Sequence, residues 1–338
     1  MTSDQSSLQN KLNLAIKLFS TNKLDEAVGH FKSIEKDQKT NKTALFYLGI
    51  IEIRKNNTKS AKEYFYKILE IDKNHEMANL NLGLVFFQEK NFEKTLDYFN
   101  RVLKINNGNL LAKYNLGLLY LIKNKFENAV NIFNEILIKE PKNINVLNNI
   151  GICFLKKMDF EKAIDTFQNC LEIDSNNKFA ILNIANAYFK SQKFEKAIEN
   201  YNKVLKIDNN HVISKIGLSK CYFALYQFEK ALDLYEARKK GQINKVKIIN
   251  NLIEKFGCKE WLGEPLNGKT ILILNEQGIG DNIQFARYIF WLKEKFNCHI
   301  IFFIDKKNSH LFENCPCDIV TNIEKIEKID FFQHLLSL

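Results

Sequence analysis

Small and aromatic residues recur at a fixed interval of 34 positions along the first 240 residues of the chain. A small residue stands in segments such as FEKA, at Ala27, Ala61, Thr95, Ala129, Ala163, Ala197 and Ala231. Twelve residues earlier stands a second small residue, at Ala15, Gly49, Gly83, Gly117, Gly151, Ala185 and Ser219. Four residues after the first stands an aromatic residue, at Phe31, Phe65, Phe99, Phe133, Phe167, Tyr201 and Tyr235. A period kept over seven units predicts a repeat architecture.

Each unit predicts two amphipathic helices joined by a short turn such as KNKF. The small residues let two helices approach closely, and the aromatic residues are expected to be core and to fill the gap to the next pair. A single hairpin cannot cover its own apolar face, so neighbouring hairpins stack into a continuous core. We therefore expect a mainly α-helical protein, with a solenoid of about seven hairpins over residues 1–241. The repeats are expected to start near residues 8, 42, 76, 110, 144, 178 and 212.

This pattern resembles the tetratricopeptide repeat (TPR). The proline common at the end of such repeats is present at Pro141 and is replaced by Asn107, Ser175 and Asn209 elsewhere. The resemblance implies a right-handed superhelix whose concave face binds peptides or partner proteins. His30, His75 and His211 lie in polar contexts without partners, and we assign them no chemistry.

Asparagine recurs two residues before the first small position of the hairpins. That position holds Asn13, Tyr47, Asn81, Asn115, Asn149, Asn183 and Gly217. Asparagine is a poor helix former, so its use in four successive repeats needs a reason. Its amide can both donate and accept, which suits the clamping of an extended peptide backbone. The series is similar to the asparagine ladder of O-linked N-acetylglucosamine transferases and kinesin light chains. Hydrogen bonding between neighbouring helices remains an equal alternative.

The pattern changes after residue 241. The segment KVKIINNLIEKF is expected to be a helix that caps the solenoid, and KEWLGEPLNGKT a turn-rich linker, together spanning 242–268. Over residues 269–338, the runs TILIL, CHIIFFI and CDIVT predict short buried strands, and DNIQFARYIFWLKEKF predicts a helix. This alternation predicts βαβ units around a parallel sheet, a small partial Rossmann-like segment.

The sequence NEQGIGD forms the loop between the first of these strands and the helix, at the edge where such sheets bind ligands. A dinucleotide loop would need a third glycine where Ile283 stands, and a Walker loop would need Gly-Lys-Ser/Thr. Asp281 would also repel a phosphate at the start of the helix. The alternative is structural: Asp281 and Gln284 form a capping box, and Gly278 and Gly280 serve a tight turn.

Residues 261–338 resemble the entry to the glycosyltransferase-like domain of bacterial TPR proteins. That domain is related to O-linked N-acetylglucosamine transferases and heptosyltransferases, and the segment Glu-Gln-Gly-x-Gly-Asp carries the resemblance. The resemblance implies a GT-B architecture of two Rossmann-like halves. It makes Asp281 a tentative general base, with Gln277, Gly278, Gly280 and Asn282 in the loop around the substrate.

The family continues with a second half that holds most nucleotide-sugar contacts, whereas this sequence ends at Leu338. We expect the segment to be incomplete, with an uncovered sheet edge and face, and not to be competent as an enzyme alone. The chain would be a fragment, a remnant, or one of two partners. A nucleotide sugar is then expected only if the domain is completed.

Composition excludes several other functions. The net charge is +10, but residues 241–338 hold equal numbers of acidic and basic side chains, and the excess lysines are spread over every repeat. Nucleic-acid binders concentrate such charge, so we expect no nucleic-acid partner. Cys315 and Cys317 have only His310 nearby, so we expect no metal, and no motif calls for a cofactor. The chain shows no secretory signal and no apolar run of about 20 residues, which predicts a cytoplasmic protein.

Three functions remain. The first is a scaffold that binds a protein or peptide in its repeat groove and carries an incomplete glycosyltransferase-like domain. The second is a nucleotide-sugar-dependent glycosyltransferase whose repeats select a protein acceptor. The third is an assembly factor in which the α/β segment only caps the solenoid.

Overall fold

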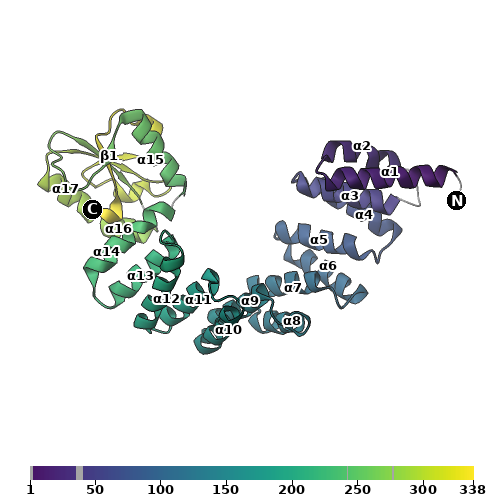
Figure 1. Cartoon of the computed structure of the whole chain (residues 1–338). Coiled ribbons are helices and arrows are strands. Elements are labelled where there is room, and N and C mark those ends of the chain that lie inside the picture. Colours follow the sequence, from purple (N-terminus) through teal and green to yellow (C-terminus); the bar gives the residue numbers. More distant parts are fainter. Residues whose placement is uncertain (1–2, 36–40, 242, 276–277) are drawn as a thin grey trace. The chain divides into compact units, whose positions relative to one another are not determined.

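The computed structural model describes residues 3–35, 41–241, 243–275 and 278–338. The chain divides into two compact units, Met1–Ile207 and Asp208–Leu338. In the described part of the first, every element is a helix, and the second combines helices with a parallel sheet (Figure 1). The expectation of a mainly helical solenoid followed by a small parallel sheet is therefore confirmed.

The first unit contains six helical hairpins. We call the first helix of each hairpin its A helix and the second its B helix. The A helices are α1 (Ser3–Ser20), α3 (Asn41–Arg54), α5 (Glu76–Gln88), α7 (Leu110–Ile122), α9 (Ile144–Lys156) and α11 (Lys178–Lys190). The B helices are α2 (Leu24–Ile34), α4 (Thr58–Ile71), α6 (Phe92–Ile105), α8 (Phe126–Lys139), α10 (Phe160–Ile173) and α12 (Phe194–Ile207).

The repeating small and aromatic residues meet inside each hairpin. A Cβ atom added to Gly83 of α5 would lie 2.6 Å from the Phe99 ring of α6, and one added to Gly117 would lie 2.4 Å from the Phe133 ring. The aromatic residues of the first six repeats are at most 1% exposed, which confirms that they are core. Their place differs in part from the expectation, because the rings of Phe65, Phe99, Phe133 and Phe167 cover the glycine of their own hairpin.

The helix ends explain part of the remaining pattern. Side chains of Asn109, Asn143 and Asn177 accept a hydrogen bond from the third backbone N–H of their A helices. His75 occupies the same position before α5, where its Nδ1 accepts from Ala78 N at 3.2 Å. His211 does the same before α13 (Val212–Ala224), accepting from Ser214 N at 3.3 Å. The expectation that these two histidines lack partners is therefore wrong.

The second unit begins with a seventh hairpin, α13 (Val212–Ala224) and α14 (Phe228–Tyr235), followed by the 3-10 helix η1 (Glu236–Gly241) and α15 (Ile243–Phe256). The strands are β1 (Lys259–Glu260), β2 (Thr270–Leu274), β3 (His299–Phe303), β4 (Asp318–Val320) and β5 (Phe331–His334). Between them lie α16 (Ile279–Phe285), α17 (Arg287–Lys295), η2 (Ser309–Phe312) and η3 (Ile323–Lys325), and η4 (Leu335–Ser337) follows β5.

All pairs in the sheet are parallel, in the order β1-β5-β2-β3-β4. In register, Ile271 of β2 pairs with Ile300 of β3 and with Phe331 of β5. The last strand in sequence therefore lies next to β2, in the middle of the sheet. β1 and β5 come from segments that the sequence indicated as a linker and a chain end.

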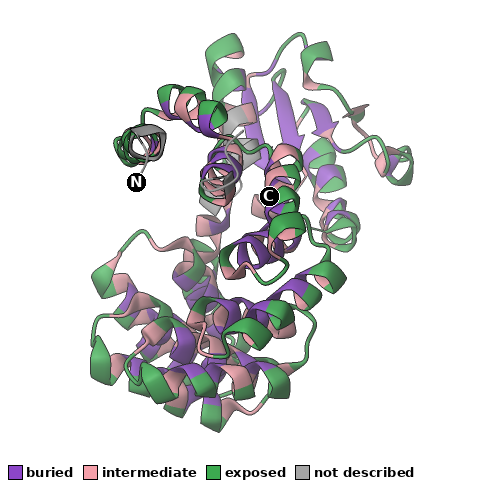
Figure 2. Cartoon of the chain, turned by 90° about the vertical axis from the view of Figure 1, so that its right-hand side faces the viewer, coloured by how far each residue is buried: buried purple, intermediate pink, exposed green. Residues whose placement is uncertain are grey.

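Helices cover both faces of the sheet (Figures 1 and 2). Ile271 and Ile273 pack with Ile289 and Leu292 of α17 on one face. Leu272 and Leu274 of β2 pack with Leu252 of α15 on the other. Three expectations are corrected here. The α15 segment packs on the sheet rather than capping the repeats, no face of the sheet is left bare, and the expected single helix breaks at Ala286 into α16 and α17.

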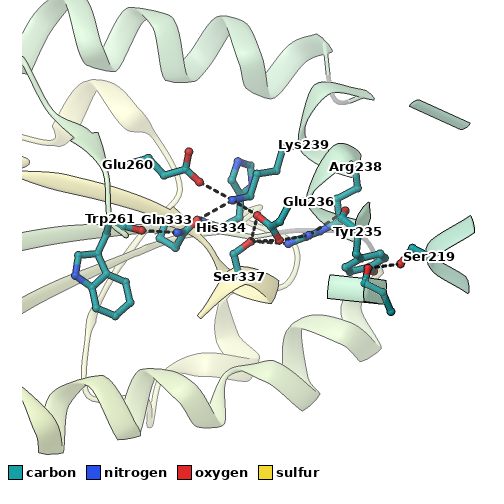
Figure 3. Close-up of polar contacts among 11 residues, drawn as sticks. Ser219, Tyr235, Glu236, Arg238, Lys239, Glu260, Trp261, Gln333, His334 and Ser337 are labelled. Carbon is teal, nitrogen blue, oxygen red and sulfur yellow. Dashed lines mark hydrogen bonds and ion pairs between the residues drawn. The ribbon is translucent and has the colours of Figure 1, made fainter. Parts of the chain in front are cut away.

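A polar network joins η1 to the end of the sheet within the second unit (Figure 3). Arg238 is 5% exposed. Its guanidinium donates to Glu236 Oε1 at 2.6 Å and to Ser337 Oγ at 2.6 Å. Burial alone would raise the pKa of Glu236, but hydrogen bonds from Lys239 and Arg238 outweigh it and lower that pKa.

The same network continues to β1 and β5. Lys239 Nζ donates to Glu260 Oε1 at 2.5 Å and to Gln333 Oε1 at 3.2 Å. Gln333 Nε2 in turn donates to the Trp261 carbonyl oxygen at 2.7 Å (Figure 3). Each contact joins residues far apart in sequence, so the network holds η1, β1 and β5 together as one body.

Candidate functional site

The asparagines predicted to bind a partner lie on the side of each A helix that faces away from its B helix. Gly83 faces the B helix, since its Cβ position touches the Phe99 ring. Asn81 precedes Gly83 by two residues, or about 200° around an α-helix. The same relation holds for Asn115 and Gly117, and for Asn149 and Gly151. We call the side that carries Asn81, Asn115, Asn149 and Asn183 the asparagine face.

Two of these asparagines bond to their own helix. Asn81 Nδ2 donates to the Met77 carbonyl oxygen at 2.7 Å, and Asn115 Nδ2 donates to that of Leu111 at 2.8 Å. Their residues are only 7% and 9% exposed. Because an amide has two N–H groups and one oxygen, each side chain keeps a donor and an acceptor for other partners.

The other asparagines differ from these two. Asn149 Nδ2 donates to the Tyr114 hydroxyl of the preceding repeat at 3.2 Å, which fits the alternative of bonding between neighbouring helices. Asn183 is half-buried, and no hydrogen bond to its side chain occurs among the residues that the structure describes. Asn13 is exposed and its oxygen accepts from Gln9 Nε2 at 3.0 Å. Among these asparagines, Asn183 therefore has the most amide donors and acceptors available for a ligand.

The second predicted site lies where β2 leads into α16. Helix α16 begins earlier than expected, with Gly278 at its N-cap, so Asp281 is at the third helical position. Asp281 Oδ2 accepts from Gly278 N at 3.3 Å, and buried Asn282 donates from Nδ2 to the Gly278 carbonyl oxygen at 3.2 Å. The expected capping box of Asp281 with Gln284 is therefore wrong. Gln277 lies outside the described residues.

The two glycines of this loop do not make a left-handed turn. Gly278 has φ −79° and Gly280 lies inside α16, whereas the positive φ angles of glycine fall at Gly257, Gly263 and Gly268. A Cβ atom on Gly280 would meet no atom within 4 Å among the described residues, and one on Gly278 would meet only Asp281 Oδ2 at 3.8 Å. Neither glycine therefore needs the left-handed region of the backbone, and the described residues leave the space at Gly280 open.

Sequence reasoning missed the apolar side chains on the asparagine face. Met77, Leu111 and Phe179 precede Asn81, Asn115 and Asn183 by four residues, and they are 45%, 50% and 70% exposed. The 34-residue alignment contained this signal, because the three residues are 34 and 68 positions apart. Among the described residues, no three His, Cys, Asp or Glu side chains gather to hold a metal ion. No described helix is long and apolar enough to span a membrane.

Comparison with known proteins supports the repeat assignment. Family models described as tetratricopeptide repeat match residues 43–75, 111–137, 144–177 and 179–211. No curated protein matches the chain in a sequence search.

Solved structures are similar to the chain in fold. A tetratricopeptide repeat protein from Parabacteroides merdae aligns at a TM-score of 0.56 and 19% identity, over 74% of this chain and 98% of that one. PilF from Pseudomonas aeruginosa aligns at a TM-score of 0.48 and 20% identity, over 57% of this chain and 88% of PilF. MamA from Desulfovibrio magneticus aligns at a TM-score of 0.48 and 15% identity, over 50% of this chain and 96% of the MamA chain. The repeat assignment itself rests on the family models, which identify the segments 43–75, 111–137, 144–177 and 179–211 as tetratricopeptide repeats.

Proposed function

We propose that the chain is a scaffold that binds an extended protein segment or peptide along its asparagine face. The observation that carries this proposal is the amide series at Asn81, Asn115, Asn149 and Asn183, on the side of the A helices away from the B helices. The remaining amide groups can accept from the N–H and donate to the C=O of an extended main chain. Such contacts favour a peptide backbone irrespective of its side chains.

The test is selection of a displayed random peptide library on the whole chain, followed by fluorescence anisotropy with a recovered peptide. Replacing Asn81, Asn115 and Asn183 together by alanine is expected to weaken binding by about fivefold per residue, because a net hydrogen bond contributes on the order of 1 kcal/mol. Asn100→Ala with Asn134→Ala is the matched control, since both are exposed on B helices. Recovery of no peptide, or equal affinities for all variants, would reject the proposal.

The resemblance of residues 261–338 supports a second candidate, a glycosyltransferase that uses a nucleotide sugar. The specific observation is the position of Asp281 at the start of the helix that follows β2, beside an open space above Gly280. We infer that residues 269–338 are part of a Rossmann-like domain, after repeats over 1–241 and a connection over 242–268. We also infer a cytoplasmic location.

In that reaction, the Asp281 carboxylate would take the proton of the acceptor hydroxyl. The acceptor oxygen would then bond to the anomeric carbon, and the nucleotide would leave with the electrons of the broken bond. Asp281→Asn is expected to abolish transfer from a nucleotide sugar to a protein acceptor and to leave peptide affinity unchanged. If the unaltered chain transfers no sugar, either by itself or in complex with a partner chain, the glycosyltransferase role is rejected and only the scaffold role stands.

A further inference from the structure

The asparagine face carries apolar side chains that the proposed main-chain contacts do not use. Met77, Leu111 and Phe179 sit at one position of three repeats, four residues before an asparagine. Residues four apart are neighbours on a helix surface, so each apolar side chain lies beside its asparagine. The hydrogen bonds of Asn81 and Asn115 to the carbonyls of Met77 and Leu111 place these pairs together.

Exposure of these side chains is not required by the fold. Phe179 is 70% exposed and Leu111 is 50% exposed, although the seven-repeat pattern supplies a core for each hairpin. Seven residues after the apolar position, on the same side of the helix, stand half-buried Leu84, Leu118 and Ile152. In α5 and α7 the face therefore offers apolar surface on both sides of the amide, and in α9 and α11 on one side.

Basic side chains complete the far end of this face. Lys156 of α9 and Lys190 of α11 are eleven residues after the repeat position that holds Asn145 in α9 and Phe179 in α11, again on the same side of the helix. Both are exposed, and neither forms an ion pair among the residues that the structure describes. Several other lysines of this unit are paired, including Lys62 with Glu89 and Lys157 with Glu127. Two unpaired cations beside an apolar surface favour a partner that carries carboxylates.

We propose that the occupant of the asparagine face is an extended protein segment that alternates bulky apolar residues with acidic residues. This proposal rests on the proposed scaffold function and adds its selectivity. The amides of Asn81, Asn115 and Asn183 hold the main chain. Met77, Leu111 and Phe179 cover the apolar side chains of the segment, and Lys156 and Lys190 pair with its carboxylates.

Three fluorescent synthetic peptides of equal length test this selectivity on the whole chain by anisotropy: apolar–acidic, polar–acidic and apolar–basic. The apolar–acidic peptide is expected to bind at least tenfold more tightly than the other two. Leu111→Ala with Phe179→Ala is expected to remove at least tenfold of that affinity. Ile138→Ala is the matched control, because Ile138 is 80% exposed on a B helix. Lys156→Glu with Lys190→Glu is expected to shift preference to the apolar–basic peptide, whereas Lys139→Glu with Lys206→Glu, on B helices, is not.

The outcomes separate this inference from the function on which it rests. One outcome is that all three peptides bind with equal affinity, bind more weakly to the asparagine variant, and bind unchanged to Leu111→Ala with Phe179→Ala. The proposed selectivity is then wrong, and the scaffold function stands. If neither these peptides nor a displayed library binds, both proposals fail. Self-association of the chain that Phe179→Ala abolishes would make this face an interface between copies and would overturn the proposal of an acidic partner.

Discussion

One residue in each of the seven hairpins has a positive φ angle between the A and B helices. The set is Asn22, Asn56, Lys90, Asn124, Met158, Gln192 and Tyr226, with φ between 56° and 64°. The backbone N–H of Lys90 donates to the Phe87 carbonyl oxygen at 3.0 Å. The backbone N–H of Asn91 donates to the Phe86 carbonyl oxygen at 2.9 Å. This is the Schellman arrangement that ends a helix and usually takes glycine.

Replacing Lys90 by glycine is therefore expected to stabilise the chain by about 1 kcal/mol, because a Cβ atom is unfavourable in this conformation. Asn124→Gly is the matched control. Asparagine tolerates the left-handed region, so its gain is expected to be smaller. Urea unfolding of both variants measures the difference. A loss of stability in Lys90→Gly would contradict the strain at this position.

His75 predicts a second effect at a single residue. Its Nδ1 must be unprotonated to accept from Ala78 N. Burial lowers the pKa of His75 from 6.5 and Lys42 adds to this, although Asp72 opposes both. Because the folded pKa is below the unfolded value, the unfolded chain binds the proton first. The stabilisation is complete above about pH 6.5 and is lost as the pH falls through the folded pKa.

His75→Asn keeps a capping side chain that does not titrate, as at Asn109 and Asn143. Between pH 7.5 and 5.5, the original chain is expected to lose more stability than this variant, because only the histidine cap takes up a proton in this range. Urea midpoints at several pH values measure it, with His30→Asn as a histidine replacement that alters no cap. If the urea midpoint changes with pH in the same way for the original chain and for His75→Asn, the proposed role of the histidine cap is rejected.

At the scale of elements, the helices of the repeats could be predicted from the sequence because the residues that recur every 34 positions contact one another within a hairpin. The small residue at Gly117 and the ring of Phe133 are sixteen residues apart in one hairpin, so local pairing creates the pattern. Strand β5 did not follow, because FFQH is a short apolar run that reads equally as buried strand or helix. The break at Ala286 lacks proline or glycine and was equally invisible.

Glycine replacements in two helices are expected to act in opposite directions. A Cβ at Gly117 would lie 2.4 Å from the buried Phe133 ring, so Gly117→Ala is expected to destabilise by about 1 kcal/mol after the gain in helix propensity. A Cβ at Gly29 of α2 would meet nothing within 4 Å among the described residues, so Gly29→Ala is expected to stabilise by about 0.5–1 kcal/mol. Thermal and urea unfolding measure both, and changes of the same sign would contradict the close packing at Gly117.

At the scale of the whole molecule, the two compact units predict separable stability. The contacts of Arg238 described above all lie in the second unit, and its side chain is 4% exposed. Arg238→Met removes one of the two cationic partners of Glu236, whose half-buried carboxylate keeps Lys239 and the Ser337 hydroxyl. We expect a cost of about 2–3 kcal/mol, less than for a fully buried pair because Glu236 is 43% exposed.

Hydrogen exchange is expected to show faster exchange in residues 208–338 of the Arg238→Met variant, with protection over 3–35 and 41–207 unchanged. Lys203→Met is the control, since it breaks an exposed pair with Glu199 and is expected to cost less than about 0.5 kcal/mol. Equal loss of protection in both units would show that they unfold together.

For the candidate site, the sequence indicated the asparagine positions but not their bonding. The 34-residue period alone placed Asn81, Asn115 and Asn183 on one face, because a helix has a fixed 3.6-residue turn. Whether an amide bonds to its own helix, to Tyr114 or to nothing depends on how closely neighbouring helices approach, as the 3.2 Å contact from Asn149 to Tyr114 shows. Exposure of Phe179 likewise depends on what the next repeat covers.

The sequence by itself determined the hairpins, their period, their aromatic core and the presence of parallel strands, because these depend on contacts close in the chain. Only the tertiary structure decided the order of the strands, the place of β5 beside β2 and the packing of α15 on the sheet. It also decided the network from Arg238 to Ser337, which joins residues about 100 positions apart. Such contacts leave no periodic pattern, because each is made once, between segments whose sequences carry no repeat to align.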